Sequence, residues 1–138
     1  MEKTFEGARV TGLVPMVQVA DVERSAAFYG HLGFAIGNYV PRTGQKAWAW
    51  LYAPDAPDWK RGPNLMITRS ESGSGAPAHD VVLYLYVTDL KALRSRLVAN
   101  GLTPGEITYP DYLPAGECCL KDPDGYTLMM AQVTADTP

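Results

Sequence analysis

Hydrophobic positions along the chain fall into segments of two kinds, and the two kinds follow one another in a definite order. Short runs rich in β-branched and aromatic residues, bounded by Gly, Pro or Asp, are typical of β-strands. Two longer segments repeat their apolar residues at the spacing of amphipathic helices. Strands are predicted at residues 13–19, 34–40, 47–52, 64–69, 81–87, 107–109, 117–121 and 127–132.

Each of the two predicted helices has a start signal and a stop signal. Asp21 and Asp89 can cap the N-termini, because an aspartate side chain accepts a hydrogen bond from the free N–H groups of the first turn. Gly33 and Gly101 mark the ends, since glycine readily adopts the left-handed backbone that terminates a helix. The apolar positions are Val22, Ala26 and Tyr29 in the first helix and Leu90, Leu93 and Leu97 in the second.

The order strand–helix–strand–strand–strand occurs twice, and the two copies align at a constant shift of 68 residues. Self-similarity at a fixed spacing indicates an internal repeat. We therefore expect one α+β domain over residues 1–138. Its two βαβββ modules, at 13–69 and 81–132, are joined by a Ser/Gly-rich linker at 70–80. The aligned pairs are Val14 and Val82, Val19 and Val87, Asp21 and Asp89, Val22 and Leu90, and Gly33 and Gly101.

A turn motif, Asp122-Pro123-Asp124-Gly125, lies between the last two predicted strands. Proline early in the motif and glycine at its end favour a tight connection between antiparallel strands. A calcium-binding loop also uses closely spaced aspartates, but Pro123 and the lack of downstream ligands argue against one. We expect the motif to be structural.

Composition excludes several classes of protein. The chain has 138 residues, of which 46% are hydrophobic and 20% charged, as in an ordinary packed domain. A net charge of only -3 and an aromatic content of 10% are incompatible with intrinsic disorder. The isoelectric point is near 5.3 and no basic stripe is present, so we expect no nucleic-acid partner.

The expected location of the protein depends on two kinds of segment, a membrane helix and a signal peptide. No apolar run reaches the roughly 18 residues that a membrane helix needs, so no membrane partner is expected. Residues 1–11 contain four charged side chains and no apolar stretch of a signal peptide, which favours the cytoplasm. Cys118 and Cys119 are neighbours on one predicted strand and should point to opposite faces. We therefore expect two reduced thiols.

Paired modules with these motifs resemble the vicinal oxygen chelate superfamily, which includes glyoxalases, extradiol dioxygenases and bleomycin-resistance proteins. The resemblance rests on a strand that ends in V-x-D before a helix containing FYGHLGF, and on the terminal DPDGYTLMMAQ. It covers Leu13 to Gln132 and implies that the two modules form a cupped mixed sheet. It also implies a homodimer in which each cavity draws on both subunits. The superfamily contains both metalloenzymes and metal-free binding proteins, so the fold does not fix the function.

The resemblance also implies four positions for the ligands of a divalent ion. Carried over to this chain, these positions hold Val14, Met66, Val82 and Met129. Valine has no donor atom, and a thioether is too soft for a hard divalent ion. We therefore expect no metal and no other cofactor.

Other residues offer only weak support for catalytic chemistry. His31 lies near the end of the first helix, where it is suited to the helix dipole, and His79 lies three residues before the ligand position of its strand. Glu117 could point inward from a strand start, although a lone carboxylate there is more often solvated or hydrogen-bonded. Lys121 shares a strand face with Cys119, but a small buried thiol is the more common role.

Strand alternation identifies the side chains that should line the cup. They are aromatic rings, thioethers and a few amides or hydroxyls, a combination suited to a planar, largely apolar organic molecule. For Trp48 and Trp50 a dimer interface is an equally good interpretation. Tyr109 and Tyr112 lie in a loop that could cover the cavity mouth. The candidate ligand-binding residues are Met16, Gln18, Trp48, Trp50, Met66, Tyr84, Tyr86, Tyr109, Tyr112 and Met129.

The hypothesis from sequence is thus a metal-free, homodimeric binding protein that sequesters a small aromatic or apolar drug or metabolite. Two other classes stay open. One is an enzyme of the superfamily, of lyase or dioxygenase type, with displaced metal ligands or with a tyrosine or glutamate as acid–base. The other is a structural or regulatory module whose cavity is vestigial.

Overall fold

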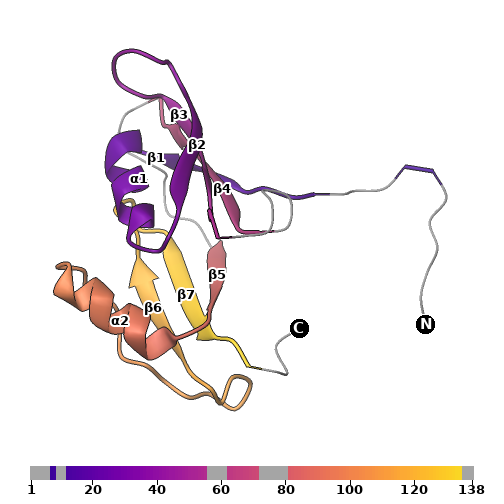
Figure 1. Cartoon of the computed structure of the whole chain (residues 1–138), viewed down its shortest axis with the longest axis vertical. Coiled ribbons are helices and arrows are strands. Elements are labelled where there is room, and N and C mark those ends of the chain that lie inside the picture. The colour runs from indigo at the N-terminus through magenta and orange to yellow at the C-terminus, as the bar shows by residue number, and fades with distance from the viewer. Residues whose placement is uncertain (1–6, 9–11, 56–61, 72–80, 135–138) are drawn as a thin grey trace.

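The structure is a computed structural model that describes residues 7–8, 12–55, 62–71 and 81–134. It contains a βαβββ module followed by a βαββ module, and Figure 1 shows each helix flanking the sheet of its own module. The first module comprises β1 (Met16–Val19), α1 (Val22–Gly30), β2 (Ala35–Val40), β3 (Trp48–Tyr52) and β4 (Asn64–Arg69). The second comprises β5 (Val82–Val87), α2 (Leu90–Ala99), β6 (Glu117–Lys121) and β7 (Thr127–Gln132).

Both modules build a mixed sheet with the same plan. The first sheet has the strand order β1-β4-β3-β2 and the second the order β5-β7-β6. In each, the first strand pairs in parallel with the last, and the remaining pairs are antiparallel. The α+β fold class is therefore confirmed. No helix in the described parts of the chain is long and apolar enough to cross a membrane.

The boundaries of the two helices are alike. Asp21 caps α1 by accepting a hydrogen bond from the backbone N–H of Arg24, and Asp89 caps α2 in the same way from Ala92. Gly33 and Gly101 follow the two helices with φ of +96° and +85°. An L-residue with a side chain rarely adopts such a φ, so the aligned glycines have the same physical role.

Two predicted strands need correction. The segment 107–109 is not a strand: Thr108 makes only an isolated bridge to Glu117. Pro104 and Pro110 bracket this segment, and proline cannot donate to a ladder, so pairing along β6 stays local. The first strand begins at Met16 rather than at residue 13. Most of the predicted linker, and His79, lie outside the described residues.

The core lies between each sheet and its helix. Alternate residues of the strands are buried on the helix side, which leaves the opposite face of each sheet open. Each Å² of apolar surface that is buried here stabilises the fold by about 25 cal/mol. The buried residues are Val17, Val19, Val22, Phe28, Tyr29, Ala49, Leu51, Leu65 and Ile67 in the first module. In the second they are Leu90, Leu93, Leu97, Cys118, Leu120, Tyr126, Leu128 and Met130.

The turn between β6 and β7 joins the second module to the first. The hydroxyl of buried Tyr29, on α1, donates to Asp122 Oδ2 at 2.8 Å. Asp124 Oδ1 accepts from the backbone N–H of Ala20 at 2.8 Å, and Asp124 Oδ2 from the hydroxyl of Ser25 at 3.3 Å. The predicted turn is confirmed, and its two carboxylates are held by donors of the protein itself.

Tyr126 completes this joint at the end of β1. Its hydroxyl donates to the carbonyl oxygen of Gln18 at 3.0 Å and accepts from the N–H of the same residue at 3.1 Å. Burial, followed by the nearby charge of Asp122, raises the pKa of Tyr29, and burial also raises the pKa of Tyr126. Both phenols therefore stay protonated, and the joint keeps its donors at neutral pH.

Candidate ligand-binding site

The open face of the second sheet, which we call the tyrosine face, carries two tyrosines, a glutamate, a cysteine and a lysine. The strand register pairs Tyr84 with Met129 and Met129 with Cys119, so these side chains project from the same side of the sheet. The tyrosine face consists of Val82, Tyr84, Tyr86, Glu117, Cys119, Lys121, Thr127, Met129 and Ala131.

A buried carboxylate organises one end of the tyrosine face. Glu117 is only 4% exposed, and each of its oxygens accepts a phenol hydroxyl. Tyr84 donates to Oε1 at 3.0 Å, and Tyr112, from the loop before β6, donates to Oε2 at 2.6 Å. The Tyr84 ring also stacks with that of Tyr86, with centroids 6.1 Å apart and an angle of 30° between the planes.

These hydrogen bonds fix the protonation state of the two phenols. Donation to Glu117 is the main reason why the pKa of Tyr84 and that of Tyr112 are raised. The phenols therefore remain protonated donors across the physiological range. The rings stay accessible, because Tyr84 is 44%, Tyr86 56% and Tyr112 71% exposed.

The open face of the first sheet, which we call the tryptophan face, holds stacked rings and no charge. Trp50 stacks on Tyr52 with centroids 5.1 Å apart and planes 19° apart, and its indole N–H donates to Asn64 Oδ1 at 2.7 Å. The register places the following residues on this face: Asn38, Val40, Trp48, Trp50, Tyr52, Asn64, Met66, Thr68, Met16 and Gln18.

A glycine makes the stacking of Trp50 possible. A Cβ atom at Gly37 would lie 2.4 Å from two carbons of the Trp50 ring and 3.0 Å from Tyr52. The register of β2 also shifts between Ile36 and Asn38, as at a β-bulge. The indole therefore lies directly on the backbone of β2, where no side chain fits.

The sequence-predicted residues divide between the two faces. Met16, Gln18, Trp48, Trp50 and Met66 lie on the tryptophan face, and Tyr84, Tyr86 and Met129 lie on the tyrosine face. Tyr112 adjoins the tyrosine face through Glu117. The two sheets share no hydrogen-bonded strand pair in the described part of the chain. Of these residues, the lining of the cavity between the modules includes Tyr84 and Tyr86.

Tyr109, like Tyr112, lies in the loop before β6 and belongs to neither face. Its ring lies beside Gly116, where an added Cβ atom would come within 3.1 Å of the ring. It is more than half exposed.

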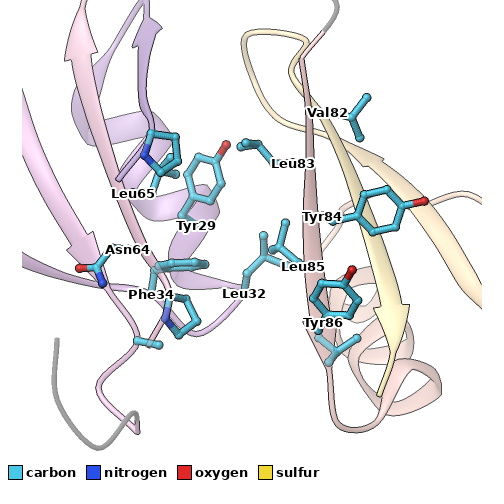
Figure 2. A pocket seen from close by; sticks show the side chains of 14 residues that line it. Tyr29, Leu32, Phe34, Asn64, Leu65, Val82, Leu83, Tyr84, Leu85 and Tyr86 are labelled. Atoms are coloured by element: carbon cyan, nitrogen blue, oxygen red, sulfur yellow. The ribbon is translucent and has the colours of Figure 1, made fainter. Parts of the chain in front are cut away.

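An apolar cavity of about 440 Å³ lies between the modules, and its lining includes Tyr84 and Tyr86 of β5 and Asn64 of β4. Figure 2 shows Leu83 and Leu85 of β5 pointing across it toward Tyr29 and Leu32, while Tyr84 points to the other side of the strand. Leu83 and Leu85, which alternate with the tyrosines along β5, are half-buried walls of this cavity. It borders the joint between the modules and offers little polar chemistry for ligand recognition.

The donor atoms present do not fit the divalent ion of the superfamily's metalloenzymes. Met66 pairs laterally with Met16 and Trp50, and Met129 with Tyr84, so thioethers and rings surround these positions. Within the described residues, no group of three or more His, Cys, Asp or Glu side chains converges. The one carboxylate on the tyrosine face is already held by two phenols.

Glu117 is the functional candidate that sequence reasoning undervalued. Alternation along 117–121 already placed Glu117, Cys119 and Lys121 on one strand face. What the sequence did not reveal was that Tyr84, 33 residues away, and Tyr112 converge on its carboxylate.

The chain is similar in sequence to one protein family. The family model described as "Glyoxalase/Bleomycin resistance protein/Dioxygenase superfamily" matches residues 12–130. No curated protein matches the chain in sequence.

Solved structures share the fold at low sequence identity. A bleomycin-binding protein in complex with bleomycin has 21% identity and a TM-score of 0.66, over 91% of this chain and 100% of that one. TnmS3, an antibiotic-binding protein from Streptomyces sp. CB03234, has 21% identity and a TM-score of 0.68, over 95% and 100%. A glyoxalase-related enzyme from Clostridium phytofermentans has 18% identity and a TM-score of 0.72, over 94% and 100%.

Proposed function

The chain belongs to the glyoxalase/bleomycin resistance protein/dioxygenase superfamily, and from this starting point we propose that it binds a planar, largely apolar organic ligand without a metal and without converting it. The observation that carries the proposal is the pair of open sheet faces on which aromatic rings are already held in place. Trp50 is fixed by Tyr52 and Asn64, and Tyr84 by Tyr86 and Glu117.

Ring stacking supplies the affinity in this proposal. Preorganised rings lose little rotamer freedom when a ligand binds, so most of the contact energy is retained. Each aromatic pair contributes about 0.5–1.5 kcal/mol beyond its buried area. The similarity in fold to a bleomycin-binding protein and to an antibiotic-binding protein supports sequestration of a drug or metabolite.

The proposed assembly is a homodimer. β1 and β5 are edge strands of their sheets, and exposed edges favour association. In a symmetric dimer the tryptophan face of one chain can lie beside the tyrosine face of its partner, which completes a cavity that one chain leaves divided. Light scattering at micromolar concentration should give twice the mass of the chain. A strict monomer would contradict the assembly.

A ligand screen tests the function. We expect planar aromatic compounds to quench or shift tryptophan emission, and mass spectrometry to recover the bound compound unchanged. Replacing both Tyr84 and Tyr86 by Ala should weaken binding about tenfold or more, because two stacking contacts are lost. The matched control is Tyr39→Ala on β2, where the ring packs under Arg42 and Lys46 instead.

The outcomes of the screen separate the classes of protein. Chemical conversion of a bound compound would assign the chain to the enzymes of the superfamily. Absence of binding by any planar aromatic compound would leave a structural or regulatory module. Equal affinity of the wild type and the Tyr84/Tyr86 double variant would remove the tyrosine face from the site.

A further inference from the structure

We propose, building on the function proposed above, that the ligand carries a positive charge, such as a protonated amine, and that Glu117 with its two phenols is the subsite for that charge. The proposal goes beyond stacking, because planarity alone does not determine the charge of a ligand. It rests on the burial of Glu117, on the absence of a cation beside it among the residues that the structure describes, and on the geometry of Tyr84 and Tyr112.

Among the described residues, Glu117 has no cationic side chain as its partner. In the described parts of the chain, ion pairs join Arg24 to Asp124, Lys46 to Glu23 and Arg94 to Glu106, and none includes Glu117. A carboxylate in a poorly solvated position is costly unless opposite charge or hydrogen bonds compensate it. Two phenols compensate it in part, and a cation brought by the ligand would complete the compensation.

The phenols also make the negative charge of Glu117 felt at the surface, because their own oxygens become stronger hydrogen-bond acceptors. Each hydroxyl donates its proton to the carboxylate, so its oxygen becomes a better acceptor for a second donor outside. The exposed rings of Tyr84 and Tyr86 add the negative potential of their π faces, which attracts cations within about 6 Å. An ammonium group placed here meets acceptor oxygens and aromatic faces together.

The opposite end of the tyrosine face has the opposite charge. Lys121 ends β6 four residues after Glu117, which is roughly 13 Å along a strand, and its ammonium group donates to Thr127 Oγ1. The charge of the face therefore changes sign along its length, from Glu117 at one end to Lys121 at the other. A cationic ligand would bind with its charge over Tyr84 and Tyr112 and its uncharged ring toward Met129.

A charge series on one ring system tests the inference. The probes are 9-(aminomethyl)anthracene, which is cationic at neutral pH, 9-anthracenemethanol, which is neutral, and anthracene-9-carboxylate. In fluorescence titrations of the full chain we expect the amine to bind about tenfold more tightly than the alcohol, and the carboxylate most weakly. Raising the salt concentration should weaken the amine more than the alcohol.

Two variants locate the effect. Glu117→Gln keeps the size and an acceptor oxygen but removes the charge, so the preference for the amine over the alcohol should disappear while alcohol binding is retained. Glu106→Gln removes the same charge from a side chain that is 89% exposed, and it should leave the preference unchanged. If Glu117→Gln does not fold, the affinities of the wild type for the amine and the alcohol still test the cation subsite.

Each result has a definite meaning. Equal affinity for the amine and the alcohol, or a preference that survives in Glu117→Gln, overturns the cation subsite and leaves the aromatic binding function standing. If none of the three anthracenes binds, both the function and the subsite are wrong.

Discussion

The two modules share one backbone plan, yet the open faces of their sheets differ in chemistry. On the tryptophan face, Trp50 is held between Tyr52 and the backbone at Gly37, with its N–H on Asn64, and no residue of the face is charged. On the tyrosine face, a buried glutamate holds two phenols, and a lysine lies at the far end. The same backbone plan thus presents one apolar face of stacked rings and one face with charged groups.

The strongest disruption should come at the joint that keeps the two modules together. Asp122 accepts hydrogen bonds from the Tyr29 hydroxyl and from the N–H groups of Asp124 and Tyr126. Asp122→Ala leaves these donors unsatisfied, and we expect the free energy of unfolding to fall by about 3 kcal/mol. Urea denaturation measures the change. Asp111→Ala, at an exposed loop position, is the control and should be neutral.

The next largest effect should fall on the tryptophan face alone. An alanine at Gly37 would place its Cβ 2.4 Å from the Trp50 ring, so the indole must leave its position on β2. We expect Gly37→Ala to cost about 2 kcal/mol of stability and to change tryptophan emission. Gly30→Ala, where an added Cβ meets nothing within 4 Å, is the matched control. Unchanged emission in Gly37→Ala would contradict the packing described here.

A smaller effect should appear on the tyrosine face at high pH. Because the pKa of Tyr84 and that of Tyr112 are raised in the folded state, the native protein retains protons that the unfolded chain releases near pH 10. The free energy of unfolding should therefore decline as the pH rises above about 10.

Absorbance titration of the folded protein can assign this effect to Tyr112. Tyr112→Phe should remove one phenol from the late phase of ionisation and leave the early phase as it was. Loss of an early-ionising phenol instead would show that Glu117 does not hold Tyr112 in solution.

The sequence predicted the regular parts of this molecule well because they depend on local signals. The residue ranges of β4, β6 and β7 follow directly from alternating apolar positions between turn residues. Asp21 and Asp89 identify the helix starts because capping involves residues only three positions apart. The same locality explains why the turn at Asp122 was recognised.

Contacts between distant segments were beyond the sequence. Nothing in the turn motif indicates that Asp122 would receive the hydroxyl of Tyr29, 93 residues earlier. The loop that contains Tyr112 has no periodicity, so its fold onto Glu117 depends on packing and not on pattern. Likewise, 107–109 has the composition of a strand, and only the geometry around its flanking prolines reduces it to a bridge.

The central claim, that ligand binds on the open sheet faces, is tested most directly by the reactivity of Cys119. This thiol lies in the middle of the tyrosine face beside Met129, whereas Cys118 points to the core, is 2% exposed and has a pKa raised mainly by burial. Iodoacetamide labelling, read by tandem mass spectrometry with and without saturating 9-(aminomethyl)anthracene, compares the two. If the ligand binds there, Cys119 alone reacts and the ligand slows its alkylation severalfold. An unchanged rate at Cys119 with ligand bound would contradict this claim and move the site elsewhere, such as to the cavity between the modules.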